Sequence, residues 1–394
     1  MSLDIAKLRA ETPGCETVLH FNNAGAGLMS APVLDAVVGH LRLEAEIGGY
    51  EAAAVAQDSY DNIYSALATF LNCDTQEIAL MENATVAWQA AFYGLARDFE
   101  PGDRILTAEA EYASNYIAYL QMAERIGVEI EAVPSTETGE LDVAALENMI
   151  DARVKLIAVT HIPTNGGLIN PAAEIGKVAR SAGIPYLLDA CQAAGQVPLD
   201  VEEIGCDMLS ATGRKYLRGP RGTGFLYVRQ DFLPQLEPPM IDLHGAKWTA
   251  TDGYTLRDDA RKFENWEYNV AAQIGLGVAI DYLNDLGQEA TCARISSLSM
   301  MFRQALAEIP GVTVQDIGAE QGGICSFSCA EMDAETVKMK LRDQKINCST
   351  SSVFSTRLDM SRRDLELINR ASVHYYNTED EVLRFCKALA ELVT

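Results

Sequence analysis

From residue 78 to residue 189 the chain alternates short apolar segments with amphipathic segments, and this alternation constrains its fold more than any other feature. A repeated strand–helix order predicts an α/β fold with a mostly parallel sheet and helices on both of its faces. Strands are expected at residues 78–81, 104–108, 128–133, 155–160 and 186–189. Helices are expected between them at residues 84–96, 113–126, 143–150 and 172–182.

The regions on either side have different patterns. Helical patterns cover residues 32–47 and 57–71, and residues 48–51 between them are either a hinge or a piece of pocket wall. After residue 265 we expect a smaller α+β domain, with helices in 263–286, 296–309, 334–344 and 379–392 and strands at 312–314, 323–328, 346–349 and 372–375. We therefore divide the chain into a large domain, residues 20–265, and a small domain formed by residues 266–394 and the N-terminal arm 1–19.

Composition narrows the possible partners. The 31 basic and 56 acidic residues give a net charge of −25, and nucleic-acid binding is not expected because phosphate backbones require stripes of lysine and arginine. No apolar run approaches the roughly 18 residues of a membrane span, and the N-terminus lacks the apolar core of a signal peptide, so we expect a cytoplasmic protein without membrane contact. The nine cysteines contain no Cys-x-x-Cys pair, so reduced thiols are expected, and neither a disulfide nor a metal site.

The motif at residues 211–228, ATGRKYLRGPRGTGFLYV, places a single lysine, Lys215, in a glycine-rich basic loop between two short strands. Such a loop can bind an anion through backbone N–H and guanidinium groups, and the alternative is an ordinary turn with solvated arginines. Upstream, the segment PYLLDACQA reads as a buried strand that ends in Asp189, followed by a turn that contains Gln192. An acid at the carboxyl end of a strand lies at the edge where open α/β sheets bind ligands.

Lys215 follows Asp189 by 215 − 189 = 26 residues and ends a Thr-x-x-Lys motif, with Gly-Pro and Gly-x-Gly after it. This pattern resembles the class V aminotransferase and cysteine desulfurase family of fold-type I pyridoxal-phosphate enzymes. The resemblance implies a seven-stranded large domain, a small α+β domain and a homodimer. It implies a Schiff base between Lys215 and pyridoxal 5′-phosphate, with Asp189 keeping the pyridine nitrogen protonated so that the ring acts as an electron sink. It also implies that Gln192 contacts the phenolic oxygen and that Thr212 and Arg214 contact the phosphate.

The same resemblance covers three further turns. Ala84 and Thr85, in ENAT, would open a helix whose N-terminus cradles the cofactor phosphate, and a plain helix cap is the alternative. Tyr112, in EYASN, stands where the family usually has a histidine that stacks on the pyridine ring. With a pKa of about 10, tyrosine is a poorer proton shuttle near neutral pH. Thr164, in THIPTNGGLIN, matches the polar residue that reaches the phenolic oxygen or the substrate.

Substrate contacts follow from the resemblance as well. Arg370, in NRASVHYYN, matches the arginine that pairs with the substrate carboxylate, and its alternative is a surface charge before a strand. Asn23 lies in a loop that resembles the segment laid beside that carboxylate, or that only leads into the next helix. Trp266 and Glu267 stand where related desulfurases have Gly-Thr, whose threonine reaches the phosphate of the partner subunit. This segment must therefore act differently, for example by lining the substrate pocket.

The reaction is constrained by a missing thiol. Cysteine desulfurases carry a nucleophilic cysteine in a small-domain loop, but residues 349–360, STSSVFSTRLDM, contain none, and Phe354 takes its place by register. Cys348 falls at a strand end, where a buried thiol is expected. The resemblance therefore implies an amino-acid substrate and a C–S or other β-elimination or an epimerisation, as in C–S lyase-like and isopenicillin-N-epimerase-like proteins. A class V aminotransferase and a non-catalytic cofactor-binding regulator are the alternatives, and retention of Asp189 and Lys215 argues against the regulator.

Overall fold

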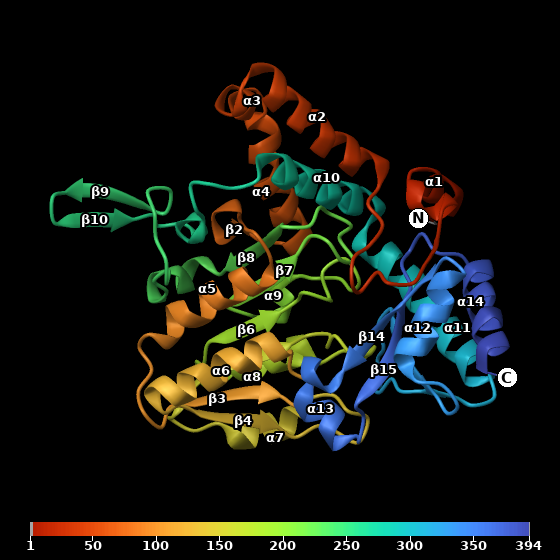
Figure 1. Ribbon diagram of the computed structural model, residues 1–394. Coiled ribbons are helices and arrows are strands. Elements are labelled where there is room, and N and C mark those ends of the chain that lie inside the picture. The colour runs from red at the N-terminus through yellow and green to blue at the C-terminus, as the bar shows by residue number, and fades with distance from the viewer. Residues whose placement is uncertain (1–2, 394) are drawn as a thin grey trace.

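The computed structural model describes residues 3–393, and a seven-stranded sheet lies at its centre (Figure 1). The strand order is β2-β8-β7-β6-β5-β3-β4. The bounds are β2 Ile78–Met81, β3 Arg104–Ala108, β4 Glu129–Val133, β5 Val154–Thr160, β6 Tyr186–Asp189, β7 Met208–Thr212 and β8 Gly224–Val228. β8 pairs antiparallel with both of its neighbours, and the other pairs are parallel. The carboxyl ends of β3, β5, β6 and β7 therefore meet at one edge.

Helices cover both faces of this sheet because successive strand residues point to opposite sides. In β5, Leu156 and Ala158 enter one apolar core, whereas Ile157 and Val159 enter the other. Strands buried on both faces read as continuous apolar runs, which is the pattern in the sequence. One face carries α5 Ala84–Ala96 and α6 Ala113–Ile126, and the other carries α4 Gln57–Leu71, α7 Val143–Met149, α8 Ala172–Ala182 and the short α9 Val201–Ile204.

A second sheet of four antiparallel strands lies beside the C-terminal helices (Figure 1). Its order is β11-β12-β15-β14, with bounds β11 Val312–Val314, β12 Ile324–Cys329, β14 Ser349–Ser352 and β15 Leu367–Ser372. The helices that accompany it are α11 Gln288–Ala307, α12 Ala334–Asp343, α13 Arg357–Arg362 and α14 Glu379–Val393. This is the smaller α+β unit that the sequence predicts.

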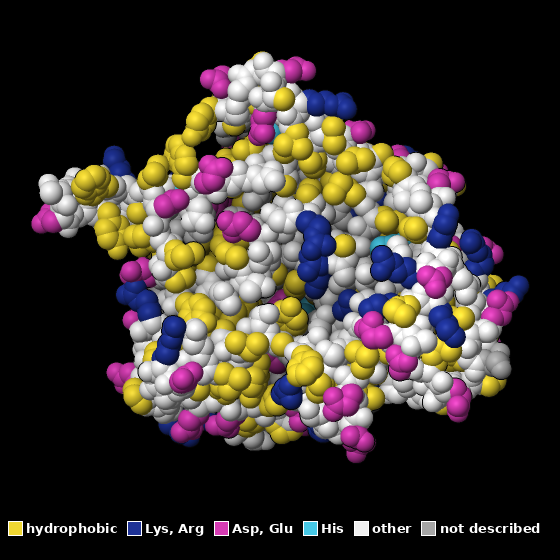
Figure 2. Space-filling model, viewed as in Figure 1, with side chains coloured by type: hydrophobic (Ala, Val, Ile, Leu, Met, Phe, Trp, Pro, Cys, Tyr) yellow, Lys and Arg dark blue, Asp and Glu magenta, His cyan; other side chains and the backbone are white. Residues whose placement is uncertain are grey.

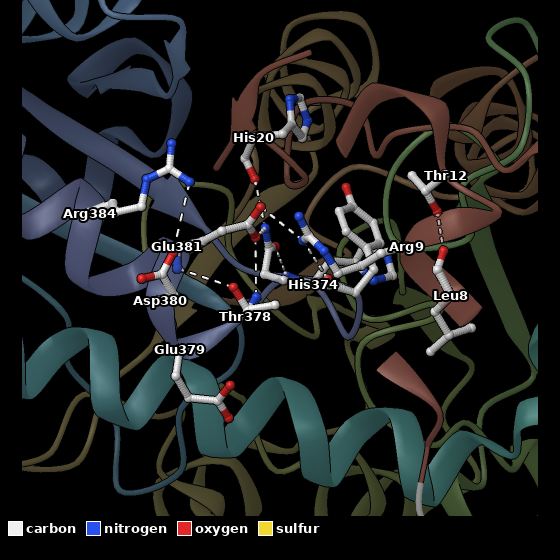
Figure 3. A network of polar contacts seen from close by, with 12 residues as sticks. Leu8, Arg9, Thr12, His20, His374, Thr378, Glu379, Asp380, Glu381 and Arg384 are labelled. Atoms are coloured by element: carbon white, nitrogen blue, oxygen red, sulfur yellow. Dashed lines mark hydrogen bonds and ion pairs between the residues drawn. The ribbon is translucent and has the colours of Figure 1, made fainter. Parts of the chain in front are cut away.

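The N-terminal arm lies against this smaller unit. β1, Leu19–His20, pairs in parallel with β13, Ile346–Asn347. In Figure 3, Arg9, which belongs to α1 (Ile5–Ala10), points toward Glu381 of α14, with 2.8 Å between Nη1 and Oε1. The Arg9 guanidinium also donates a hydrogen bond of 3.1 Å to the Tyr376 carbonyl. The arm and the last helix therefore share one polar network.

Two elements extend from the body of the molecule. α2 Ala31–Ile47 and α3 Gly49–Val55 form a raised layer over α10 Val270–Leu286 (Figure 1). The hairpin of β9 Ala246–Ala250 and β10 Gly253–Leu256 projects from the molecule, and Figure 2 shows hydrophobic side chains on it. Its Trp248 is 78% exposed. Within residues 3–393, no helix has the length and apolar character needed to cross a bilayer.

The α/β architecture and most helix and strand positions are confirmed, three local predictions are wrong, and one element has no counterpart in the predictions. The break expected at residues 48–51 is limited to Gly48, with φ of +99°, because α3 begins at the next residue. The helix expected from residue 296 begins at Gln288, where a polar first turn hides it. The strand expected at 372–375 lies at Leu367–Ser372, because buried polar residues interrupt its apolar pattern. The projecting hairpin was not predicted, because its residues lack the periodicity of a core strand.

Arg218 joins several of these parts although its side chain is buried, with 2% exposed. Its guanidinium donates hydrogen bonds of 2.6 Å to the Thr12 hydroxyl, 2.7 Å to the Leu28 carbonyl and 2.9 Å to the Tyr375 hydroxyl. It also lies 4.7 Å from the ring centre of Tyr376, a cation–π distance. Neutral acceptors and aromatic rings, rather than a carboxylate, satisfy this charge within the described chain.

We expect Arg218→Leu to lower the free energy of unfolding by about 2–4 kcal/mol, because it leaves buried acceptors unpaired in the arm and the small domain. Denaturant unfolding measures this loss. Arg384→Leu is the matched control, because Arg384 is 64% exposed and its ion pair with Asp380 should contribute less than about 1 kcal/mol. Equal losses in the two variants would show that Arg218 does not hold these parts together.

Candidate active site

The carboxyl ends of β3, β5, β6 and β7 open into a cavity of about 300 Å³. Between β3 and β5 the sheet order changes direction, and open α/β sheets bind ligands at such a switch point. Figure 2 shows Lys and Arg side chains gathered near the middle of one face. Nine residues predicted from the sequence line the cavity, namely Ala84, Thr85, Tyr112, Thr164, Asp189, Gln192, Thr212, Arg214 and Lys215.

The loop between β7 and β8 holds Lys215 inside the protein, with 8% of its surface exposed. The backbone N–H of Gly27 donates to the Arg214 carbonyl at 2.9 Å, so the N-terminal loop runs against the lysine loop. A Cβ atom on Gly27 would lie 2.6 Å from the Lys215 carbonyl oxygen, so this approach requires glycine. Burial, followed by the charges of Arg214 and Arg370, lowers the pKa of Lys215, which favours its neutral amine.

Asp189 ends β6 at the floor of the cavity. Its Oδ1 accepts a hydrogen bond of 2.8 Å from the Cys191 backbone N–H, and its Oδ2 accepts one of 2.8 Å from the Asn115 amide. Burial raises the pKa of Asp189, while these two donors and the Lys215 charge oppose that rise. These two hydrogen bonds thus fix the orientation of the Asp189 carboxylate.

Thr164, Gln192 and Arg370 connect the two sheets. The Arg370 Nη1 donates to the Thr164 carbonyl at 2.7 Å and to its hydroxyl at 2.8 Å, and the Gln192 amide lies 3.4 Å from the same hydroxyl. Arg370 is a buried residue of β15, so the alternative of a surface charge is wrong. Burial lowers its pKa to about 10. The Gln192 Oε1 and Arg370 Nε atoms are buried without a hydrogen-bond partner within residues 3–393.

The N-terminus of α5 forms the opposite end of the cavity. Asn83 caps the helix by accepting a hydrogen bond of 3.0 Å from the Val86 N–H, which leaves the Ala84 and Thr85 N–H groups available for an anion. Arg214 lies at this cavity and also donates to the Gly25 carbonyl. The Thr212 hydroxyl donates to the Thr223 carbonyl at 3.2 Å.

None of the three predicted substrate contacts lines this cavity: Arg370 bonds to its lining residue Thr164, and the other two lie apart from it. Asn23 is fully buried, and its amide donates to the Ser372 carbonyl at 2.7 Å while its oxygen accepts from the Tyr376 hydroxyl. Its side chain thus ties the N-terminal loop to the small domain. Trp266 is half exposed, and its backbone N–H donates to Asp242 at 2.7 Å, so it faces the surface of this chain.

Eight lining residues are not predicted by the sequence, and three of them carry groups that matter to the site. Arg221 lines the cavity beside Gly222. Asn115 donates a hydrogen bond to Asp189. Cys191 lines the cavity, and its thiol interacts electrostatically with Lys215. Its position directly after an acid at a strand end could have identified it.

Comparison with known proteins agrees with this geometry. The sequence model of the family "Aminotransferase class-V" matches residues 19–385. The chain belongs to this family. A probable cysteine desulfurase of Methanothermobacter thermautotrophicus is 32% identical, over 88% of this chain and 86% of its own. The solved structure of apo cysteine desulfurase from Thermococcus onnurineus superposes with a TM-score of 0.92, at 26% identity, over 100% of this chain and 98% of that chain.

A third relative is the cystine C–S lyase C-DES. Its complex with cysteine persulfide matches with a TM-score of 0.86 at 26% identity, over 96% of this chain and 99% of that chain. A second C-DES structure has glycine covalently linked to its pyridoxal-phosphate cofactor. This class-V enzyme therefore uses pyridoxal 5′-phosphate, and the cavity fits that group. The cavity offers a lysine amine for the cofactor aldehyde, a carboxylate for the pyridine nitrogen and an anion site at α5 for the phosphate. It also offers the Gln192 oxygen, which has no hydrogen-bond partner within residues 3–393.

We expect Asp189→Asn to retain some cofactor but to lose turnover by on the order of 10²-fold, because the pyridine nitrogen loses its anionic partner. Asp207→Asn is the matched control. Asp207 is a buried carboxylate that pairs with Arg229 at 2.6 Å and lies outside the cavity, so its loss should reduce stability rather than turnover. Steady-state rates per bound cofactor measure both, and near-normal turnover in Asp189→Asn would assign Asp189 a structural role.

Proposed function

We propose that the protein is a pyridoxal-phosphate-dependent lyase that cleaves the C–S bond of a cysteine-derived amino acid by β-elimination. The observation that carries this proposal is the combination of a desulfurase-like cofactor cavity with a small-domain segment that has no exposed thiol. Pyridoxal phosphate supplies an electron sink that makes the α-proton of a bound amino acid acidic. The chain's own residues then decide which bond breaks.

The segment that carries the nucleophile in desulfurases is ordered and contains no thiol here. Residues 349–360 form β14, a 3-10 turn at Val353–Ser355 and the start of α13, rather than the open loop expected from the sequence. Phe354 is 72% exposed, and the Arg357 guanidinium lies 5.2 Å from its ring centre. Nothing in this segment can accept a sulfur atom as a persulfide.

Cys348 and Cys191 are poor substitutes for the nucleophilic cysteine of the desulfurases. Cys348 is buried between β13 and β14, and burial raises its pKa to about 12, so little thiolate exists near neutral pH. Cys191 lies in the cavity, but it follows Asp189 on the same short turn, and burial raises its pKa as well. A thiol fixed on the floor of the site cannot carry sulfur away to an acceptor.

Each cavity residue then has a role in this proposal. Lys215 would hold the cofactor covalently and move the α-proton, a task that suits a buried amine with a lowered pKa. Asp189 would face the pyridine nitrogen, and Gln192 the phenolic oxygen. The phosphate would bind the N–H groups that open α5 together with Thr212 and Arg214, and Tyr112 would stack on the ring.

The substrate would be oriented from the small domain. The unpaired Nε of Arg370 and its lowered pKa describe a buried cation that a carboxylate would neutralise. Thr164 fixes that guanidinium through two hydrogen bonds, so the carboxylate would bind in one orientation. Binding the carboxylate at Arg370 would leave the α-carbon facing the lysine loop.

We expect cystine or a cysteine S-conjugate to yield pyruvate, ammonia and the released thiol or persulfide in equal amounts, as hydrolytic β-elimination requires. Quantifying these products tests the proposal, and Cys348→Ser should leave the rates unchanged. Alanine formation with stoichiometric sulfide, abolished by Cys348→Ser, would establish desulfuration instead. An oxo acid with aminated cofactor would assign an aminotransferase, and an inverted amino acid without elimination an epimerase.

We also propose a homodimer, which the family resemblance implies. Tyr50 in α3, Trp248 on the projecting hairpin and Trp266, just before α10, have exposed aromatic side chains that a second chain could cover. Sedimentation velocity should give the mass of two chains. Replacing Trp248 and Trp266 together by serine should shift the protein toward monomers. An active monomeric wild-type enzyme would refute the proposal.

A further inference from the structure

A second buried carboxylate lies behind Asp189 and outside the cavity lining. Glu111 follows β3, and its Oε2 accepts hydrogen bonds of 2.8 Å from the Thr107 hydroxyl and 3.2 Å from the Thr160 N–H. Its Oε1 accepts from the Thr160 hydroxyl, from the Tyr112 backbone N–H at 2.8 Å and from the Asn115 amide nitrogen at 2.9 Å. The same amide nitrogen donates to Asp189 at 2.8 Å. One NH₂ group thus bridges two carboxylates.

Two negative charges this close in the interior favour a shared proton, because burial and mutual repulsion both penalise the doubly ionised pair. Burial and the Asp189 charge raise the pKa of Glu111 to about 7, against the hydrogen bonds it accepts. The titratable groups that face this pair are Tyr119 from α6 and, on the cavity side of Asp189, Cys191 and Lys215. The charge of Lys215 acts on Asp189 rather than on Glu111.

The partners of the two carboxylates differ in a way that decides where the proton resides. Asp189 is contacted by an amide NH₂ group and a backbone N–H, which can only donate, so protonated Asp189 would find no acceptor there. Glu111 also accepts from N–H groups of Tyr112, Asn115 and Thr160, but its two remaining partners are the hydroxyls of Thr107 and Thr160, which can donate or accept. The Tyr119 hydroxyl is buried beside Thr107 and makes no hydrogen bond within residues 3–393, so it can accept from Thr107 when that hydroxyl reverses.

We propose that Glu111 is a positioning residue that holds the proton of the Glu111–Asp189 pair and thereby keeps Asp189 ionised toward the cofactor. When Glu111 takes up a proton at Oε2, it donates to the Thr107 hydroxyl, which turns to donate to Tyr119. When Glu111 releases the proton, the Thr107 hydroxyl turns back and donates to Glu111 again. Asn115 keeps its two hydrogen bonds in either state, so the carboxylate of Asp189 keeps its orientation.

This inference rests on the part of the proposed function in which Asp189 faces the cofactor, but not on the choice of reaction. It predicts that the proton equilibrium near pH 7 belongs to a residue that does not line the cavity. Glu111→Gln mimics the protonated form, because the amide can also donate to a hydroxyl. The protonation of Glu111 is measured spectroscopically, so a negative result in the elimination assay would not contradict this proposal.

Infrared difference spectra of the holoenzyme with ¹³C-labelled glutamate, recorded between about pH 5 and pH 9, test it. We expect a labelled band of a protonated carboxyl group that disappears with a midpoint near pH 7 and is absent from Glu111→Gln. In Asp189→Asn the midpoint should fall by about one pH unit or more, because the like charge that raises it is gone.

Glu109→Gln is the matched control. Glu109 is two residues away, but it accepts from the Ser135 hydroxyl at 2.5 Å and pairs with Arg362 at 2.5 Å, so its loss should leave the band unchanged. A wild-type enzyme without the band, a band that persists in Glu111→Gln, or an unchanged midpoint in Asp189→Asn would each overturn the proposal. If Glu111→Gln does not fold, the labelled wild-type enzyme and Asp189→Asn still decide the question.

Discussion

The burial of one amine, Lys215, is the constraint on which the rest of the structure depends. A buried ammonium group is unfavourable unless anions surround it, and a buried neutral amine needs a rigid loop to keep it from water. The loop that carries Lys215 is fixed from three directions. Gly27 of the N-terminal loop bonds to it, Arg218 ties it to the arm, and His374 of the small domain bonds to the Tyr216 carbonyl at 3.0 Å.

These contacts hold residues from the two sheets of the chain together at one site. Asp189 and its neighbours come from the carboxyl edge of the large sheet, whereas Arg370 comes from the middle strand of the small sheet and reaches Thr164. A substrate carboxylate at Arg370 and a cofactor above Asp189 would therefore be held by different layers of the molecule. The relative position of the two layers then controls the geometry between substrate and Lys215.

Much of the site could be predicted from the sequence because its residues follow strands in short local motifs. Asp189, Gln192 and the segment around Lys215 stand next to apolar runs, and parallel strands bring their carboxyl ends together. The buried network of Glu111 could not be predicted in this way, because it depends on Thr107, Thr160 and Asn115 meeting across separate elements. Asn23 and Trp266 resemble ligand contacts in sequence but lie outside the cavity of this chain, one in internal hydrogen bonds and the other at the surface, and their substrate role stays a prediction.

The covalent attachment of the cofactor to Lys215 is the property on which the proposed chemistry depends. Borohydride reduction of the holoenzyme fixes the cofactor to the amine that holds it, and peptide mass spectrometry then identifies that amine. We expect the phosphopyridoxyl group on the peptide that contains Lys215. A label on any other lysine, or a cofactor that washes away after reduction, would rule out this role for Lys215.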